Sequence, residues 1–84
     1  MEKITKVTVY STPVCPYCDM LKDFLRTRNI KFEEEDVSRD KAKAQEMIKK
    51  SKQLGVPVMI LKRGKKEEVV IGFNREKLRS IFGI

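Results

Sequence analysis

The two cysteines of the chain, Cys15 and Cys18, are separated by only two residues, Pro16 and Tyr17. On one turn of a helix, residues at i and i+3 have β-carbons about 5–6 Å apart, close to the separation that a disulfide bond tolerates. The pair can therefore open and close with little backbone movement. A disulfide that closes so short a loop stabilises a fold by only about 2 kcal/mol. The spacing thus favours reversible redox chemistry over a structural crosslink.

The positions of the two cysteines predict different roles for them. The attacking species in thiol–disulfide exchange is the thiolate. Cys15 lies where a helix is expected to begin, so that free backbone N–H groups and the positive end of the helix dipole face its sulfur. Cys18 lies one turn inside. We predict that Cys15 is the nucleophile and that Cys18 resolves the mixed disulfide, with a minor electrostatic contribution from Lys22 on the same helical face.

Two other interpretations of the cysteine pair are weaker. Free cysteines also occur as small buried apolar residues that carry no chemistry. A zinc site needs three or four protein ligands, and the chain has no histidine and no third cysteine. We therefore expect no metal site and no bound cofactor.

A short strand and a helix are expected to position the cysteines. Residues 7–10 are β-branched and aromatic with alternating apolar side chains, which is typical of a strand. Pro16 is tolerated in the first turn of a helix. Leu21, Phe24 and Leu25 then recur at helical spacing, which predicts a helix from Pro16 to about Asn29.

The rest of the chain continues the alternation of strands and helices. Residues 30–37 are extended in pattern, and their glutamates suit an edge strand. A second helix is expected from a cap at Ser38 or Asp40 to about Ser51. Its inner stripe comprises Ala44, Met47 and Ile48.

The last third predicts a hairpin and a final helix. A strand from Gly55 to Leu61 is followed by a turn at residues 63–65 and by a partner strand over 68–71. Asn74 can cap a helix that ends near Gly83, with Leu78, Ile81 and Phe82 as its apolar stripe. The pattern predicts a single α/β domain over residues 1–84, in the order β-α-β-α-β-β-α.

Net charge and hydropathy limit the kinds of partner and the location to be expected for the chain. The chain has 84 residues, a formal net charge of +7, and 40% hydrophobic residues. A net positive charge steers acidic partners toward the protein. The basic second half lacks interleaved aromatic residues and a recognisable reading motif, so no specific nucleic-acid binding is expected. No apolar run approaches the ~20 residues of a membrane span, and no signal peptide is evident. We expect a cytoplasmic, monomeric protein.

Three motifs make the chain resemble a glutaredoxin of the thioredoxin-like superfamily. Residues 15–18 read Cys-Pro-Tyr-Cys, as in dithiol glutaredoxins, and Thr12-Pro13-Val14 precedes them as in small redoxins. Residues 55–58, Gly-Val-Pro-Val, stand where that family has a cis-proline loop. Residues 72–73, Gly-Phe, match the ribonucleotide-reductase donor redoxins (NrdH-redoxins). The resemblance covers nearly the whole chain.

The resemblance implies a thioredoxin-like fold, in which three helices flank a four-stranded mixed sheet. It also implies a cis peptide at Val56–Pro57, whereas the residues alone fit either an edge strand or a cis bond. The backbone of Val56 would pair with an extended substrate segment. Tyr17 is expected either to face the substrate or to pack on the chain. The expected substrate-binding residues are Thr12, Pro13, Tyr17, Val56, Pro57, Gly72, Phe73 and Asn74.

The source of electrons is where the chain departs from the family pattern. Glutathione-using glutaredoxins usually have a lysine three residues before the first cysteine, a threonine two before the cis-proline, and a Gly-Gly-x-Asp turn. Those positions here read Thr12, Gly55 and, over residues 72–75, Gly-Phe-Asn-Arg. We therefore expect regeneration by a thioredoxin-reductase-type enzyme, with glutathione as the other possible reductant.

The sequence as a whole predicts a dithiol–disulfide oxidoreductase that acts as an electron carrier and reduces protein disulfides through Cys15 and Cys18. Two alternatives remain open. One is a glutathione-dependent glutaredoxin. The other is a non-catalytic thioredoxin-like module that binds a partner or carries an iron–sulfur cluster.

Overall fold

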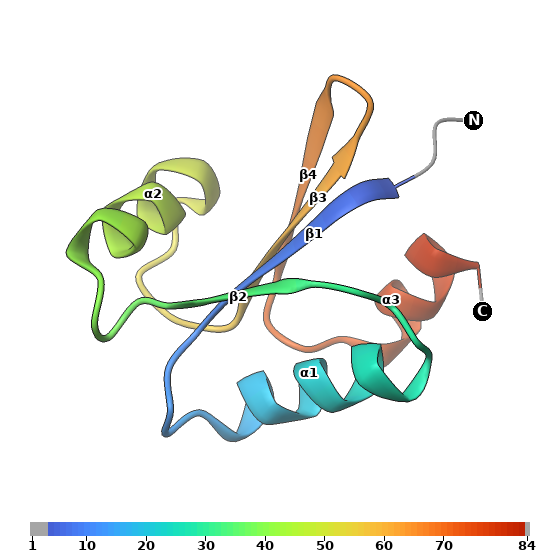
Figure 1. Cartoon of the computed structure of the whole chain (residues 1–84), viewed down its shortest axis with the longest axis horizontal. Coiled ribbons are helices and arrows are strands. Elements are labelled where there is room, and N and C mark those ends of the chain that lie inside the picture. Colours follow the sequence, from blue (N-terminus) through green and yellow to red (C-terminus); the bar gives the residue numbers. More distant parts are fainter. Residues whose placement is uncertain (1–3, 84) are drawn as a thin grey trace.

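A computed structural model describes residues 4–83 of the chain (Figure 1). Seven elements follow one another in the predicted order β-α-β-α-β-β-α. They are β1 (Ile4–Ser11), α1 (Pro16–Thr27), β2 (Glu33–Asp36), α2 (Lys41–Ser51), β3 (Val58–Arg63), β4 (Lys66–Ile71) and α3 (Arg75–Phe82).

The four strands form one mixed sheet in the order β2-β1-β3-β4. β2 pairs in parallel with β1, whereas β1 with β3 and β3 with β4 are antiparallel. The apolar strands β1 and β3 are therefore central, and the acidic strand β2 is an edge, as its glutamates predicted. Charged edges of this kind discourage pairing with another sheet.

Helices cover both faces of the sheet: α1 and α3 lie on one side and α2 on the other (Figure 1). Side chains of a strand alternate between faces. Val7 and Val9 of β1 accordingly join the core under α1 and α3, while Tyr10 joins the core under α2. The first core also takes the predicted helical residues Leu21, Phe24, Leu25 and Leu78.

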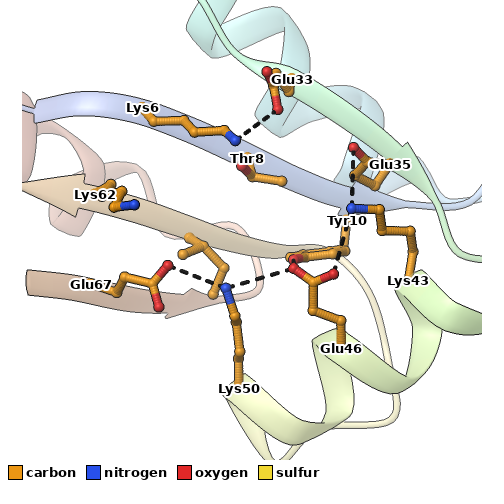
Figure 2. Close-up of a pocket in the computed structure, with 11 residues that line it drawn as sticks. Lys6, Thr8, Tyr10, Glu33, Glu35, Lys43, Glu46, Lys50, Lys62 and Glu67 are labelled. Carbon is orange, nitrogen blue, oxygen red and sulfur yellow. Dashed lines mark hydrogen bonds and ion pairs between the residues drawn. The ribbon is translucent and has the colours of Figure 1, made fainter.

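The face of the sheet under α2 has a small apolar core and, beside it, a cavity lined by polar side chains. Met47 is the buried apolar residue of α2, whereas Ile48, expected on its inner stripe, is exposed. The expectation for Ile48 was wrong because α2 approaches the sheet mainly through charged side chains. These side chains line a polar cavity of about 170 Å³ between α2 and the strands (Figure 2).

Hydrogen bonds and ion pairs link α2 to three strands across this cavity (Figure 2). The Tyr10 hydroxyl of β1 donates to Oε1 of Glu46 at 2.8 Å. That bond lowers the pKa of Glu46 below its ordinary value, and burial together with the Glu46 carboxylate raises the pKa of Tyr10. Lys43 lies 4.0 Å from Glu35 of β2. Lys50 lies 3.2 Å from Glu67 of β4.

The ends of several elements differ from the sequence-based prediction. β1 begins at Ile4 and β4 at Lys66, earlier than expected, because polar residues there still pair their backbones with β3. β2 is shorter than 30–37, and β3 runs from Val58 to Arg63 rather than from Gly55. α1 ends at Thr27, and Asn29, where the helix was expected to end, has a left-handed φ of 57°.

Candidate active site

The turn from β1 into α1 places Cys15 at the start of the helix. Cys15 is the N-cap residue, with extended φ and ψ, and Pro16 occupies the first helical turn. The Cys15 Sγ accepts a hydrogen bond of 3.1 Å from the backbone N–H of Cys18. The sulfur thus occupies the position that a serine or aspartate oxygen takes in an ordinary helix cap. A half-exposed sulfur faced by a backbone donor is the arrangement expected of an attacking thiolate.

Cys18 lies behind Cys15 and is completely buried. Burial raises the pKa of the Cys18 thiol to about 12, and the hydrogen bond with Cys15 adds to this shift. A backbone hydrogen bond from Thr12 acts in the opposite direction. Both cysteines are free thiols in this structure. The two sulfurs therefore differ in exposure, and the pKa of the buried one is raised, which fits the predicted role of Cys18 as the second thiol to react.

The loop before β3 faces the exposed cysteine. The Val56–Pro57 peptide bond is cis, as the resemblance implied. The Cys15 thiol lies 3.8 Å from the carbonyl oxygen of Val56, to which it donates. Pro57 is buried, and Val56 is half-buried. The loop therefore brings a main-chain acceptor to the sulfur from a distant part of the sequence.

The segment that leaves β4 completes this side of the site. The Gly72 N–H donates to the carbonyl oxygen of Pro57 at 2.9 Å, and Gly72 has a left-handed φ of 74°. Phe73 turns toward α1, where its ring lies edge-on to that of Phe24 with centroids 6.2 Å apart. Asn74 accepts from the Lys77 N–H and caps α3. Gly72 thus joins the loop around Pro57, while Phe73 and Asn74 have structural contacts of their own.

Apolar side chains close in sequence to Cys15 and to the Val56 loop are exposed. Val14, next to Cys15, is 88% exposed, and Leu54 of the loop before Val56 is 84% exposed. Tyr17 is 61% exposed, so its ring is largely open to solvent rather than packed in the core. Pro13 is exposed, and Thr12 is half-buried. Sequence reasoning did not select Val14 or Leu54, because the sequence does not show that these apolar side chains stay outside the core.

Comparison with known proteins identifies the family of this fold and site. Residues 7–64, more than half of the chain, match the family model described as glutaredoxin. The chain belongs to the glutaredoxin family. It is 36% identical over 72 residues to an uncharacterized glutaredoxin-like 8.6 kDa protein in a rubredoxin operon of Clostridium pasteurianum, covering 86% of this chain and 91% of that protein. It is 33% identical to glutaredoxin 3 of Escherichia coli, covering 69% of this chain and 70% of that one.

Solved structures share the thioredoxin-like fold of this glutaredoxin. A thioredoxin-like protein superposes with a TM-score of 0.83 at 33% identity, covering 96% of this chain and 99% of the other. A glutaredoxin from Archaeoglobus fulgidus gives a TM-score of 0.75 at 27% identity, with 92% and 85% coverage. The predicted four-stranded mixed sheet with three helices is confirmed.

Lys22 of this glutaredoxin pairs mainly with carboxylates, and its effect on the thiols is as small as expected. Its Nζ lies 2.6 Å from a carboxylate oxygen of Glu34 and 3.7 Å from Asp19. The hydrogen bond between Lys22 and Glu34 raises the pKa of the lysine and lowers that of the glutamate. The charge of Lys22 is the smallest of the influences on the pKa of Cys18. Lys22 therefore ties α1 to β2 and adds little at the sulfurs.

The glutaredoxin positions associated with glutathione carry different side chains here. Gly55 offers no side-chain hydroxyl, and the bulky Phe73 occupies the place of a glycine. The oxygen of Asn74 is used by the helix cap, and the guanidinium of Arg75 lies over the Phe73 ring at 6.0 Å. An arginine stands where an acidic residue usually receives the ligand's amine. This side of the groove is thus suited to an anion rather than to an ammonium group.

Among residues 4–83, no helix is long and apolar enough to cross a membrane. Over the same residues, no three histidine, cysteine or acidic side chains are grouped so that they could hold a metal ion.

Proposed function

We propose that this member of the glutaredoxin family is a dithiol–disulfide oxidoreductase, an electron carrier that reduces protein disulfides through Cys15 and Cys18. The observation that carries the proposal is the asymmetry of the two thiols. Cys15 is accessible and capped by a backbone N–H, while Cys18 is buried against it with a pKa of about 12. The exposed Cys15 sulfur can attack a substrate disulfide, and the buried Cys18 sulfur can then attack the mixed disulfide that results.

The first step breaks the substrate disulfide. The Cys15 thiolate, having lost its proton to solvent, attacks one substrate sulfur and forms a mixed disulfide. The second substrate sulfur leaves with the electron pair of the broken S–S bond and takes up a proton. The Val56 carbonyl lies beside the attacking sulfur, so an extended substrate segment that pairs with this backbone is held next to Cys15.

The second step releases the reduced substrate. Cys18 loses its proton and attacks the Cys15 sulfur, forming the Cys15–Cys18 disulfide, and the remaining substrate sulfur leaves and is protonated. Two of the influences that raise the pKa of Cys18 come from the Cys15 thiol. They are lost once that sulfur is in the mixed disulfide, so Cys18 ionises more easily when it is needed. In sum, the substrate gains two electrons and two protons, and the protein loses them.

Electrons are proposed to return through a thioredoxin-reductase-type enzyme rather than through glutathione. The support lies in Gly55, Phe73 and Arg75, which replace the residues that usually bind the glutathione backbone. The proposed setting is the cytoplasm, where free thiols persist, with the protein as a monomer and disulfide-containing proteins as substrates.

Cysteine variants test the oxidoreductase proposal. Cys15→Ser should abolish the reduction of a protein disulfide such as that of insulin. Cys18→Ser should accumulate a mixed disulfide on Cys15 that mass spectrometry detects. Dithiol activity retained by Cys15→Ser, or the absence of a trapped species in Cys18→Ser, would overturn the assignment.

The reductant is tested with the oxidised protein. One reaction contains glutathione with glutathione reductase, and the other contains NADPH with thioredoxin reductase, while the Cys15–Cys18 disulfide is followed in both. Faster reduction is expected in the second reaction. Faster turnover with glutathione would show that the altered groove still binds it.

A further inference from the structure

A cavity of about 360 Å³ lies between α1 and the segment that enters α3, outside the immediate surroundings of the thiols. Its walls include the rings of Phe24 and Phe73 and the guanidinium groups of Arg28 and Arg75. Asp23 also contributes, but its carboxylate lies 3.8 Å from the guanidinium of Arg26. The cavity thus presents two cations on an aromatic base.

The two rings hold the two guanidinium groups. The Cζ of Arg28 lies 3.8 Å from the centroid of the Phe24 ring, and that of Arg75 lies 6.0 Å from the Phe73 ring. The rings contact each other edge to face, at an interplanar angle of 72°. Stacking of this kind orients an arginine while leaving its N–H donors free for an acceptor.

Within residues 4–83, no carboxylate forms an ion pair with Arg28 or Arg75, whereas three other arginines each pair with one. Arg28 follows α1, where a cation suits the helix dipole. Arg75 is the first residue of α3, where a cation is unfavourable, although the acidic Glu76 lies in the same turn. Among the described residues, both guanidinium groups are thus without a carboxylate partner.

Tyr17 and Met20 form an exposed apolar strip of α1 between the active site and the cavity, 61% and 43% exposed. By spacing they share one helical face with Arg28 and with Phe24, whose ring is mostly buried. Along the axis of α1, Arg28 lies about 20 Å from Cys15. An extended peptide covers that distance in about six residues.

We infer that Arg28 and Arg75 form a docking site for acidic side chains of a protein partner, about six residues from the disulfide that Cys15 attacks. The inference rests on the proposed function and names the kind of partner it serves. Charge complementarity carries it: two oriented guanidinium groups without carboxylates line one cavity, and an exposed apolar strip joins them to the reactive sulfur.

Two synthetic peptides test the docking site. Each contains one internal disulfide with a seven-residue arm on either side; the outer part of each arm carries two aspartates in one peptide and two asparagines in the other. The measurement is the rate at which the reduced protein reduces each peptide at low salt. We expect the acidic peptide to react about tenfold faster, since close charge pairs on a partner's surface act mainly on association.

Matched double variants separate local docking from the attraction of a basic protein for any acidic peptide. R28Q/R75Q removes both guanidinium groups and should reduce the preference to about twofold. K62Q/K65Q removes the same charge from β3 and the β3–β4 turn, away from α1, and should keep the preference near tenfold. Circular dichroism checks that both variants fold. Equal rates for the two peptides with the unaltered protein, or an equal loss in both variants, would overturn the inference.

A binding measurement keeps this test separate from the redox proposal. If the protein reduces neither peptide, the proposed function fails, but docking is still measurable with an acidic peptide whose cysteines are replaced by serine. The Nε–Hε resonances of Arg28 and Arg75 should then shift on titration, and the asparagine peptide should leave them in place. Unchanged resonances with the acidic peptide would refute the docking site by itself.

Discussion

The backbone N–H of Cys18 donates to the Sγ of Cys15 at 3.1 Å, so the main chain of the buried cysteine helps to position the exposed sulfur. The Cys18 thiol itself is buried and has a raised pKa. This relationship separates the two thiols chemically although they are only three residues apart.

Alkylation should distinguish the two thiols. Iodoacetamide added to the reduced protein at neutral pH is expected to modify Cys15 at least about tenfold faster than Cys18, because thiolate character and access set the rate. The pKa of the Cys18 thiol is raised from about 9 to about 12, so few Cys18 thiolates form at neutral pH; the neutral buried thiol also stabilises the fold below about pH 9, and this contribution is lost as the pH rises toward 12.

Peptide mapping by mass spectrometry gives the order in which the two cysteines are labelled. Comparable labelling rates at the two cysteines would contradict the prediction that Cys15 reacts first.

Tyr10→Phe should destabilise the protein through α2. The variant removes the hydroxyl that donates to Glu46 beneath that helix, and a bond to a charged group is worth about 1–2 kcal/mol once partial exposure of the carboxylate is allowed for. Urea denaturation measures the loss. Tyr17→Phe is the control, since Tyr17 is exposed and should leave stability unchanged.

The effect of Tyr10→Phe should also depend on pH. The pKa of Glu46 is lowered in the folded protein, so its contribution is present above the ordinary carboxyl pKa of about 4.5 and is lost as the pH falls. The gap between the variant and the unaltered protein should therefore narrow at about pH 3. A gap that stays constant would show that the hydroxyl acts independently of the carboxylate.

Lys22→Met should weaken the attachment of α1 to β2. Lys22 is 12% exposed and lies 2.6 Å from Glu34. The substitution should lower the free energy of unfolding by about 1 kcal/mol, a value reduced because the glutamate is partly exposed. The pKa of Glu34 is lowered and that of Lys22 is raised. The pair therefore contributes fully between about pH 4.5 and 10.5, and the contribution fades on either side.

A second lysine provides the comparison for Lys22→Met. Lys6 also pairs with a glutamate of β2, Glu33, but both side chains are more than half exposed. Lys6→Met should change the free energy of unfolding by only about 0.3 kcal/mol. Equal losses in the two variants would mean that burial does not distinguish the pairs.

Asn74→Ala should destabilise α3. The Asn74 side chain accepts from the Lys77 N–H, and loss of such a cap costs about 1 kcal/mol. Asn74→Asp keeps an acceptor at the positive end of the helix and should retain stability. Thermal unfolding of the two variants measures the difference. Full stability in Asn74→Ala would instead leave the residue free for the substrate-binding role that the resemblance implied.

Much of the fold follows from local patterns in the sequence. Val7 and Val9 alternate with polar residues, and Leu21, Phe24 and Leu25 recur at helical spacing, so both elements beside the cysteines could be predicted. The glutamates of β2 marked an edge. The cis bond at Val56–Pro57 came only from family resemblance, because a proline alone favours trans.

Other features depend on contacts between distant residues and escaped prediction. The pattern of α2 placed Ile48 inside, but the buried Tyr10 and acidic residues on two strands draw the charged side chains of α2 toward the sheet. The minor effect of Lys22 on the thiols was foreseen, but its ion pair with Glu34 was not, because Glu34 is remote in sequence. The pairing of Arg28 with Phe24 is visible in helical spacing, but that of Arg75 with Phe73 beside it requires the fold.

The polar cavity under α2 gives the two sides of the active site different sensitivities to salt. α1 is packed on an apolar core, which salt does not weaken, whereas α2 is held largely by ion pairs that dissolved ions screen. The loop that carries Val56 follows directly from α2. Ionic strength is therefore expected to act more on the loop that holds Val56 and Pro57 than on the start of α1, where Cys15 lies.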